Sequence, residues 1–264
     1  MSTMQSKCDI LIIGAGTTGV YFGWLMAKKG HTVQIIEKDA RDQVAQRLEI
    51  IHFHPRTMAD LEIPPPIDPP ELLFHYKSVL FSRLPLFLQR MYGIVGNDGV
   101  HIEFLCEFKE LLFQNHRIIG ARVLKENEEF EILARLVVDA SGIACSVRSS
   151  LPEDYGMERW KFNSHNRFFV ILHYLKWSNP TEPHPEWGDV SPYYYIFFDP
   201  GYTKDEAIMG IAGPESFEKA EQLINELLKR ENYPPFEIKK KEYGYFAYSR
   251  VPYSLVGGGF FLCR

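Results

Sequence analysis

The feature that most constrains this chain is an apolar run, a glycine loop and a helical pattern that follow one another near the N-terminus. Residues 9–13 (Asp-Ile-Leu-Ile-Ile) are typical of a strand buried on both faces. The loop Gly14-Ala-Gly-Thr-Thr-Gly19 comes directly after it, and residues 20–29 predict a helix that Gly30 ends. Residues 32–37 predict a second strand. Because strand–helix–strand crossovers are right-handed, we expect the two strands to be parallel neighbours.

The spacing of three glycines and one acid indicates what this unit binds. Gly14 permits the tight turn out of the strand, Gly16 lets backbone approach a pyrophosphate, and Gly19 lets the helix pack closely. The first turn of the helix offers free N–H groups to the phosphates. Glu37 lies 18 residues beyond Gly19, where an acid accepts hydrogen bonds from a ribose with a free 2′-hydroxyl. The segment predicts a dinucleotide site; a glycine-rich turn in an ordinary α/β fold is the alternative.

No second regular βαβ repeat succeeds this unit. Pro64 to Pro70 predict a stiff surface connection near residues 60–80. The next predicted elements are a helix at 84–92, a strand at 100–108, a hairpin formed by 117–124 and 130–134, and a buried strand at 135–139. That strand leads into Ala140-Ser-Gly142, a turn of small residues where backbone can lie against a flat cofactor.

Beyond about residue 150 the pattern changes. Residues 168–175, 193–198 and 207–211 predict antiparallel strands, and apolar residues recur at helical spacing over 217–228. We therefore predict an α/β fold, in which an FAD- or NAD(P)-binding Rossmann-like βαβ domain carries an inserted, mostly antiparallel β-sheet substrate domain. The expected bounds are 1–150 for the FAD-binding domain and 151–250 for the substrate sheet.

Several stretches together resemble the glutathione-reductase-type flavoproteins. They are the glycine loop with Glu37, the stretch His116-Arg-Ile-Ile-Gly-Ala-Arg-Val123, and Leu136-Val-Val-Asp-Ala-Ser-Gly142 through Arg148. More narrowly the chain resembles the geranylgeranyl reductase family and the related single-component flavin hydroxylases. FAD is the expected cofactor, since a plain NAD domain would continue with further βα units. We assign the cofactor contacts to Gly14, Ala15, Gly16, Thr18, Gly19, Glu37, Lys38, Arg47, Phe108, Asp139 and Gly142.

Two of these assignments are implied by the resemblance alone. Arg47 matches a basic residue that helps to hold the flavin, and backbone near Phe108 matches the adenine contact. An exposed helix charge explains Arg47 equally well. Some reductases of the family carry a Cys-Gly motif just after this region, whereas residues 48–55 contain no cysteine.

Residues 192–198 (Pro-Tyr-Tyr-Tyr-Ile-Phe-Phe) resemble the reductases' aromatic signature, Tyr-x-Trp-x-Phe-Pro. Tyr195 stands in place of the Trp, and Phe198 in place of the Pro. By strand alternation Tyr193, Tyr195 and Phe197 share one face. We expect them to line an apolar slot for substrate; tight packing against a neighbouring layer is an equally open interpretation.

Near the end of the chain, Val251-Pro252 and Gly257 to Cys263 resemble the family's last strand toward the flavin. The resemblance implies that residues 251–264 form a strand that returns to the FAD-binding domain. There the family continues into a Gly-Asp-Ala motif whose Asp helps to bind the flavin ribityl–phosphate region, whereas Arg264 is the last residue here. The chain is therefore expected to be truncated before that motif. A fragment, a shortened gene product and a degenerate relative are all compatible with this pattern.

The resemblance implies an FAD-dependent oxidoreductase that reduces carbon–carbon double bonds of an isoprenoid or other apolar substrate. NAD(P)H or another external donor would reduce the flavin. A single-component flavin monooxygenase (a hydroxylase or epoxidase) acting on a small apolar or aromatic substrate is the alternative, and a non-catalytic FAD-binding relative is a second one. No residue has a positional argument for catalysis, so none is assigned.

Composition excludes other classes. The net charge of −5 gives no basic footprint for nucleic acid, and the one clear basic run, Lys239 to Lys241, predicts a solvated strand edge. Four scattered cysteines without a CxxC pair disfavour disulfides and structural zinc and predict a reducing, cytoplasmic location. No metal site is expected. The apolar runs near the N-terminus are too short to span a membrane, although peripheral membrane contact stays open.

Overall fold

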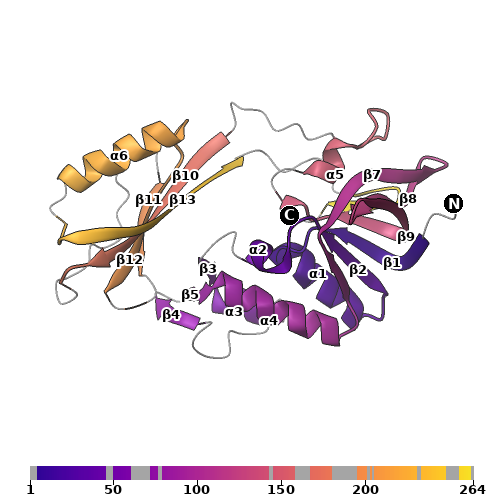
Figure 1. Ribbon diagram of the computed structural model, residues 1–264, viewed down its shortest axis with the longest axis horizontal. Helices are drawn as coiled ribbons and strands as arrows, with labels where there is room; N and C mark the ends of the chain where they lie inside the picture. The colour runs from indigo at the N-terminus through magenta and orange to yellow at the C-terminus, as the bar shows by residue number, and fades with distance from the viewer. Residues whose placement is uncertain are drawn as a thin grey trace. The chain divides into compact units, whose positions relative to one another are not determined.

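The computed structural model divides into two compact units, residues 1–161 with 251–264, and residues 162–250 (Figure 1). The residues that the structure describes are 5–45, 50–60, 72–76, 79–142, 145–157, 167–179, 195–200, 203, 205–230, 233–247 and 256–262. The predicted proline-rich connection from Pro64 to Pro70 lies outside them.

The first unit is built on an eight-stranded sheet within the described residues. Its strands are β1 (Gln5–Ile13), β2 (Val33–Glu37), β6 (His101–Phe104), β7 (Cys106–Gln114), β8 (Arg117–Lys125), β9 (Glu128–Asp139), β14 (Val256–Gly257) and β15 (Phe260–Leu262). The helices of the unit are α1 (Thr17–Lys28), α2 (Arg41–Ala45), α3 (Pro55–Asp60), α4 (Leu84–Asn97) and α5 (Ser146–Ser149). A separate antiparallel sheet has the order β3 (Ile50–Phe53), β5 (Val79–Arg83) and β4 (Leu72–Tyr76).

The centre of the large sheet is parallel, in the order β15-β9-β1-β2-β6. Ile12 of β1 pairs with Ile35 of β2 on one side and with Val138 of β9 on the other. The first half of β9 pairs antiparallel with β8, and its last residues pair in parallel with β15, where Leu262 lies beside Asp139. The carboxyl ends of β15, β9, β1 and β2 therefore meet at one edge of the sheet.

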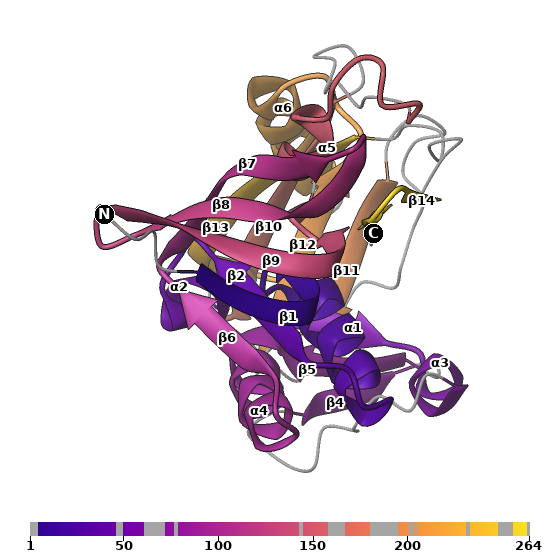
Figure 2. The same ribbon diagram turned by 90° about the vertical axis from the view of Figure 1, so that its right-hand side faces the viewer.

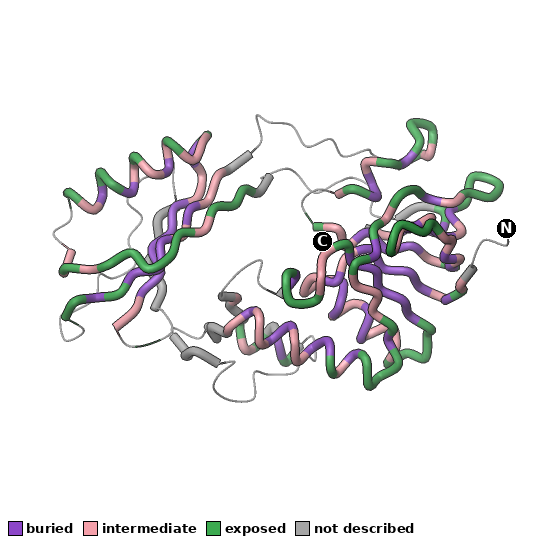
Figure 3. Tube along the Cα trace, viewed as in Figure 1, coloured by how far each residue is buried: buried purple, intermediate pink, exposed green. Residues whose placement is uncertain are grey.

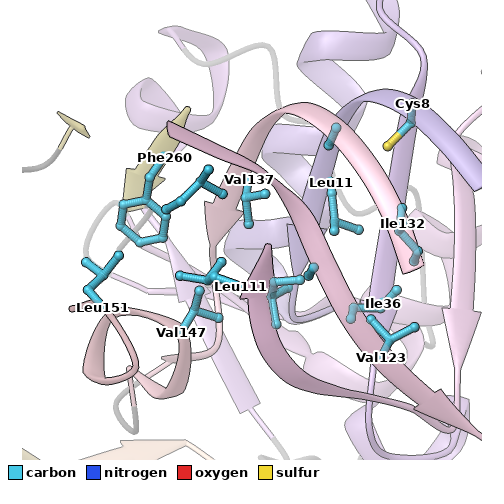
Figure 4. Close-up of a cluster of buried hydrophobic side chains, with 14 of the residues drawn as sticks. Cys8, Leu11, Ile36, Leu111, Val123, Ile132, Val137, Val147, Leu151 and Phe260 are labelled. Carbon is cyan, nitrogen blue, oxygen red and sulfur yellow. The ribbon is translucent and has the colours of Figure 1, made fainter. Parts of the chain in front are cut away.

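Both faces of the parallel strands are covered, which explains the apolar sequence of β1. Ile10 and Ile12 pack with residues of α1 and α4, whereas Leu11 and Ile13 pack with β7, β8 and α5. Figure 2 shows β7 and β8 on one side of the strands and α1 and α4 on the other. Figure 4 shows the cluster of apolar side chains that contains Leu11, in which Phe260 of β15 is fully buried. The central strands are accordingly buried along most of their length (Figure 3).

Two strand predictions need correction. The expected strand at 100–108 is broken into β6 and β7 by Leu105, whose φ of 55° is left-handed and cannot continue a strand. The expected strands at 130–134 and 135–139 are one strand, β9, because the chain runs straight from its pairing with β8 into its pairing with β15. The hairpin turn is at Glu126 and Asn127, whose positive φ values suit a two-residue turn.

The second unit is an antiparallel sheet with one helix on it. Its strands are β10 (Arg167–Trp177), β11 (Tyr195–Pro200), β12 (Glu206–Ala212) and β13 (Phe236–Ala247), in the order β11-β12-β10-β13, and its helix is α6 (Phe217–Arg230). Ala220, Ile224 and Leu227 of α6 pack on Ile171 of β10 and Met209 of β12. The basic run at residues 239–241 lies exposed on β13, which is an edge strand among the described residues and agrees with the sequence prediction.

The predicted fold class is confirmed: a parallel-centred α/β unit accompanies a separate, antiparallel sheet with a helix on it. Among the described helices, none combines the length and the apolar character needed to cross a membrane.

One polar side chain is sealed inside the second unit. His173 of β10 is 1% exposed, and its Nε2 lies 3.7 Å from Oε1 of Glu221 on α6. Neither ring nitrogen has a hydrogen-bond partner within the described part of the chain. Glu221 is itself held by Lys241 Nζ at 2.9 Å and by the Tyr243 hydroxyl at 2.7 Å. Burial lowers the pKa of His173, the nearby Lys241 charge lowers it further, and Glu221 opposes them.

This burial predicts acid sensitivity of the second unit. Below the ordinary histidine pKa of about 6.5, the unfolded chain takes up a proton that folded His173 resists, so the free energy of unfolding falls as the pH is lowered. His173→Gln should make stability fall less between about pH 6.5 and 5 than it does in the wild type. Denaturant unfolding at several pH values measures this, with exposed His101→Gln as the control. Parallel profiles for wild type and His173→Gln would contradict the prediction.

Candidate functional site

A cavity of about 480 Å³ lies in the first unit, where β1, β2 and β9 end and α1 begins. In parallel α/β sheets this is the edge at which ligands bind. The lining residues come from these strand ends, from the glycine loop, from the starts of α1, β7 and α5, and from the turn after β9. They are Ile13, Gly14, Gly16, Thr17, Thr18, Ile36, Glu37, Lys38, Asp39, Cys106, Glu107, Phe108, Ala140, Ser141, Gly142 and Ser146.

Two of the three motif glycines are required by the protein itself. Gly14 has a φ of 114°, and a Cβ there would lie 2.3 Å from the Ala140 carbonyl oxygen. A Cβ on Gly19 would lie 2.0 Å from the Gly14 carbonyl oxygen. Since real Cβ atoms do not approach that closely, these two positions allow the glycine loop, helix α1 and the turn after β9 to meet backbone to backbone.

Gly16 is different, because no contact within the described residues requires a glycine at this position. A Cβ there would have nothing within 4 Å among the described residues, and its φ of −71° is open to any residue. Gly16 is the N-cap of α1, makes no side-chain cap hydrogen bond, and accepts the first helical bond from Val20 N. The N–H groups of the first helical turn have no carbonyl partner within the helix. They stand beside the cavity and suit an anion.

Glu37 forms another part of the cavity wall. Its side chain is buried, Oε2 accepts from Ala15 N at 3.0 Å, and Oε1 accepts from Asp39 N at 3.2 Å. These two backbone donors fix the carboxylate at the end of β2, where Glu37 lines the cavity. Lys38, which is exposed, and Asp39 follow it along the cavity wall.

The turn after β9 is organised by a buried acid. Asp139 is 1% exposed; its Oδ1 accepts from Ser141 N at 3.0 Å and from Ser141 Oγ at 2.5 Å, and its Oδ2 accepts from Arg148 N at 2.8 Å. Ser146 N donates to Ser141 Oγ at 3.0 Å. Asp139 therefore does not line the cavity. It holds the turn that brings Ala140, Ser141 and Gly142 to the cavity.

The third wall is the start of β7. Cys106 is 1% exposed, and burial, together with the negative charge of Glu103, raises the pKa of its thiol to about 12. The thiol is thus neutral at physiological pH and contributes a small apolar surface, beside Glu107 and Phe108.

Most of the predicted cofactor residues meet at this cavity. Seven of them line it: Gly14, Gly16, Thr18, Glu37, Lys38, Phe108 and Gly142. Ala15, Gly19 and Asp139 lie behind it and support its walls. Arg47 and Tyr193 lie outside the described residues, and so do the side chains of Tyr195 and Phe197, whose backbone forms part of β11. The described residues contain no group of His, Cys, Asp or Glu that could hold a metal ion.

Sequence reasoning missed part of the lining. Ile36 and Asp39 reach the cavity because β2 ends between them at this sheet edge, whereas Cys106 lies at the start of β7 and Ser146 at the start of α5. Ile36 and Asp39 flank Glu37 and Lys38, so the boundary of the second strand was a usable signal. Cys106 had none, since the break at Leu105 decides where β7 starts.

A strand, a glycine loop, a helix N-terminus and an acid at the end of the next strand define a dinucleotide-binding α/β protein. Residues 7–63 match the family model described as an FAD binding domain. This match supports FAD as the cofactor, and it confirms the resemblance to FAD-dependent oxidoreductases that the sequence showed.

Solved structures share the fold over almost the whole chain. A geranylgeranyl bacteriochlorophyll reductase-like protein from Thermoplasma acidophilum aligns with a TM-score of 0.82 at 14% identity, over 98% of this chain and 71% of its own. The myxobacterial chondrochloren halogenase, an FAD-dependent halogenase, gives 0.69 at 16%, over 97% and 68%. The anhydrotetracycline hydroxylase from Streptomyces rimosus gives 0.66 at 15%, over 97% and 56%. At these identities the likeness shows the fold.

The contrast between the glycines gives a stability prediction. Gly19→Ala should lower the free energy of unfolding by about 1–3 kcal/mol or more, because its Cβ would overlap the Gly14 carbonyl. Gly16→Ala should cost no more than about 1 kcal/mol, the difference between Gly and Ala at an N-cap. Denaturant titration of the two apoproteins measures both. Equal losses would contradict the assignment of Gly16 as a position free of protein contact.

Proposed function

We propose that the cavity of the first unit binds FAD, with the pyrophosphate at Gly16 and the adenosine ribose at Glu37. The observation that carries this is Gly16: a glycine stands at the open N-terminus of α1, where a Cβ would meet no atom of the described residues. A ligand that comes within contact distance of backbone there supplies the reason for the missing side chain.

The other walls fit the same group. The fixed carboxylate of Glu37 suits the two hydroxyls of a ribose, and backbone at Phe108 and the turn at Gly142 offer flat surfaces to rings. Lys38 adds one positive charge beside the acids Glu37 and Asp39. Arg47 stays a proposed contact of the flavin. Bound FAD would supply hydride transfer, and the chain would hold it, orient it and exclude water from it.

We propose, further, that the reaction is the reduction of carbon–carbon double bonds in an isoprenoid or similar apolar substrate. Two observations support a reductase over a monooxygenase: the TM-score is higher against the reductase-like protein than against the hydroxylase, and residues 192–198 resemble the reductases' aromatic signature. Tyr193, Tyr195 and Phe197 are the proposed substrate residues, and NAD(P)H or another external donor is the proposed reductant. In β11 the register sets Tyr195 beside Ala212 and Phe197 beside Gly210.

The cofactor proposal predicts that Gly16→Val abolishes flavin binding while the fold survives. The branched side chain would occupy the place of the pyrophosphate but would meet little protein. Visible flavin absorbance after purification and titration of apoprotein with FAD measure occupancy. Gly93→Val on α4 is the control for a valine on a helix surface, since a Cβ at Gly93 also meets no atom in the described part of the chain. Wild-type flavin occupancy in Gly16→Val would overturn the cofactor site.

The reaction proposal predicts chemistry without oxygen. Dithionite-reduced protein, incubated anaerobically with geranylgeraniol in detergent, should yield product that has gained two hydrogen atoms for each reduced double bond, as mass spectrometry would detect. A monooxygenase would give no product under these conditions, and in air would consume oxygen and add an oxygen atom to the product. That second pattern would overturn the reductase proposal and leave the FAD site intact.

A further inference from the structure

We infer that Tyr92 of α4 is a positioning residue for the cofactor, acting through the glycine loop; this rests on the proposed FAD site. Tyr92 is 77 residues from Ala15 in sequence, yet its hydroxyl donates a buried hydrogen bond of 2.8 Å to the Ala15 carbonyl oxygen. Ala15 N in turn donates to Glu37 Oε2 at 3.0 Å. Ala15, which lies between the first two glycines, is thus held from two sides: its carbonyl bonds to α4, and its N–H bonds to β2.

The held carbonyl sets the direction of a group that faces the cavity. In a planar trans peptide the C=O and N–H bonds point in opposite directions. Because the Ala15 carbonyl points to Tyr92, the N–H of Gly16 in the same peptide points away from α4. Gly16 lines the cavity, so the hydroxyl of Tyr92 determines the orientation of a donor at the proposed pyrophosphate position.

The ring of Tyr92 is itself held in place by residues of β6 and α2. It is 5% exposed and meets the Phe104 ring edge-on, with ring centroids 5.2 Å apart. Phe104 of β6 is the register partner of Glu37 in β2. The guanidinium of Arg41 in α2 lies 5.5 Å from the Tyr92 ring centroid, and Arg41 Nε donates to Gln89 Oε1 at 2.7 Å. Tyr92 therefore contacts the surroundings of Glu37 by its ring and the glycine loop by its hydroxyl.

Tyr92→Phe separates these two contacts. The ring packing survives, while the Ala15 carbonyl loses its donor and the loop gains freedom. The dissociation constants of FAD and of ADP, which carries the adenosine ribose and the pyrophosphate, should both rise about three- to tenfold, the change produced by one net hydrogen bond. In a Glu37→Ala background the same substitution should have a smaller effect, because the two residues act on one peptide.

Two matched variants separate positioning from general stability. Tyr155→Phe also removes a tyrosine hydroxyl from a backbone carbonyl of the first unit, that of Gly258. Asp98→Ala removes the acceptor of a hydrogen bond from Trp24 Nε1. That bond joins α1 to the C-terminal end of α4, away from the glycine loop. Both should lower the unfolding midpoint and leave the dissociation constants unchanged. A readout independent of flavin is hydrogen exchange of apoprotein amides in the peptide spanning residues 14–20, which should quicken in Tyr92→Phe but not in Tyr155→Phe.

The outcomes are distinguishable. If wild type binds FAD and Tyr92→Phe binds it equally well with unchanged exchange at residues 14–20, the positioning role is overturned and the proposed function stands. If wild type binds neither FAD nor ADP, the proposed function is overturned, and the exchange measurement still decides whether Tyr92 holds the loop. A rise in the dissociation constants of all three variants would also overturn the role, since the effect would then track stability.

Discussion

The glycine loop, the start of α1 and the turn after β9 contact one another through backbone atoms where β1 ends. The geometry of the site depends on that contact. The Gly14 position leaves room for the Ala140 carbonyl, and the Gly19 position leaves room for the Gly14 carbonyl. With no side chains between them, α1 starts directly against the ends of β1 and β9. The first-turn N–H groups of the helix are thereby brought to the cavity, together with the turn that Asp139 organises. A single methyl group at either glycine would push these segments apart, and the cavity would lose its floor.

The packing around this contact explains why it is rigid. Alternate side chains of β1 enter two different cores, so the strand cannot shift its register without moving apolar side chains to the wrong face. β9 is long enough to pair with β8, β1 and β15, and this joins residues near both ends of the chain into one sheet. At the return of the chain, Gly259 has a φ of 79°, and a Cβ there would lie 2.2 Å from the Ile118 carbonyl oxygen. Close backbone contact at a glycine, together with the hydrogen bond from Val137 N to the Gly259 carbonyl, thus positions β15 beside β9.

Sequence reasoning could predict the features that depend on local pattern. The apolar run of β1, the glycine spacing and the position of Glu37 are all read within one βαβ unit, and the structure brings these residues together at one cavity. Features that depend on distant partners were not predictable. Tyr92 contacts Ala15 only because α4 packs on α1, and Cys106 lines the cavity only because Leu105 takes a left-handed conformation that its residue type does not suggest. The role of the Asp139 side chain also depends on contacts that the pattern does not give: its carboxylate accepts from the backbone of the turn that follows β9.

A site that binds mainly through backbone places few demands on the rest of the sequence. At this cavity the donors suited to an anion include main-chain N–H groups of a helix terminus, whose direction is set by the fold and not by side-chain identity. The side chains with specified chemistry are few: Glu37 at the end of β2, Lys38 after it, Asp139 at the end of β9, and the glycines where backbone must come close. The remaining positions need only preserve the two cores, which tolerate many apolar combinations of similar volume. This accounts physically for solved structures that share the fold with TM-scores of 0.66 to 0.82 at only 14–16% identity. It also means that the fold fixes where a cofactor lies, whereas the choice of substrate depends on side chains that the backbone does not dictate.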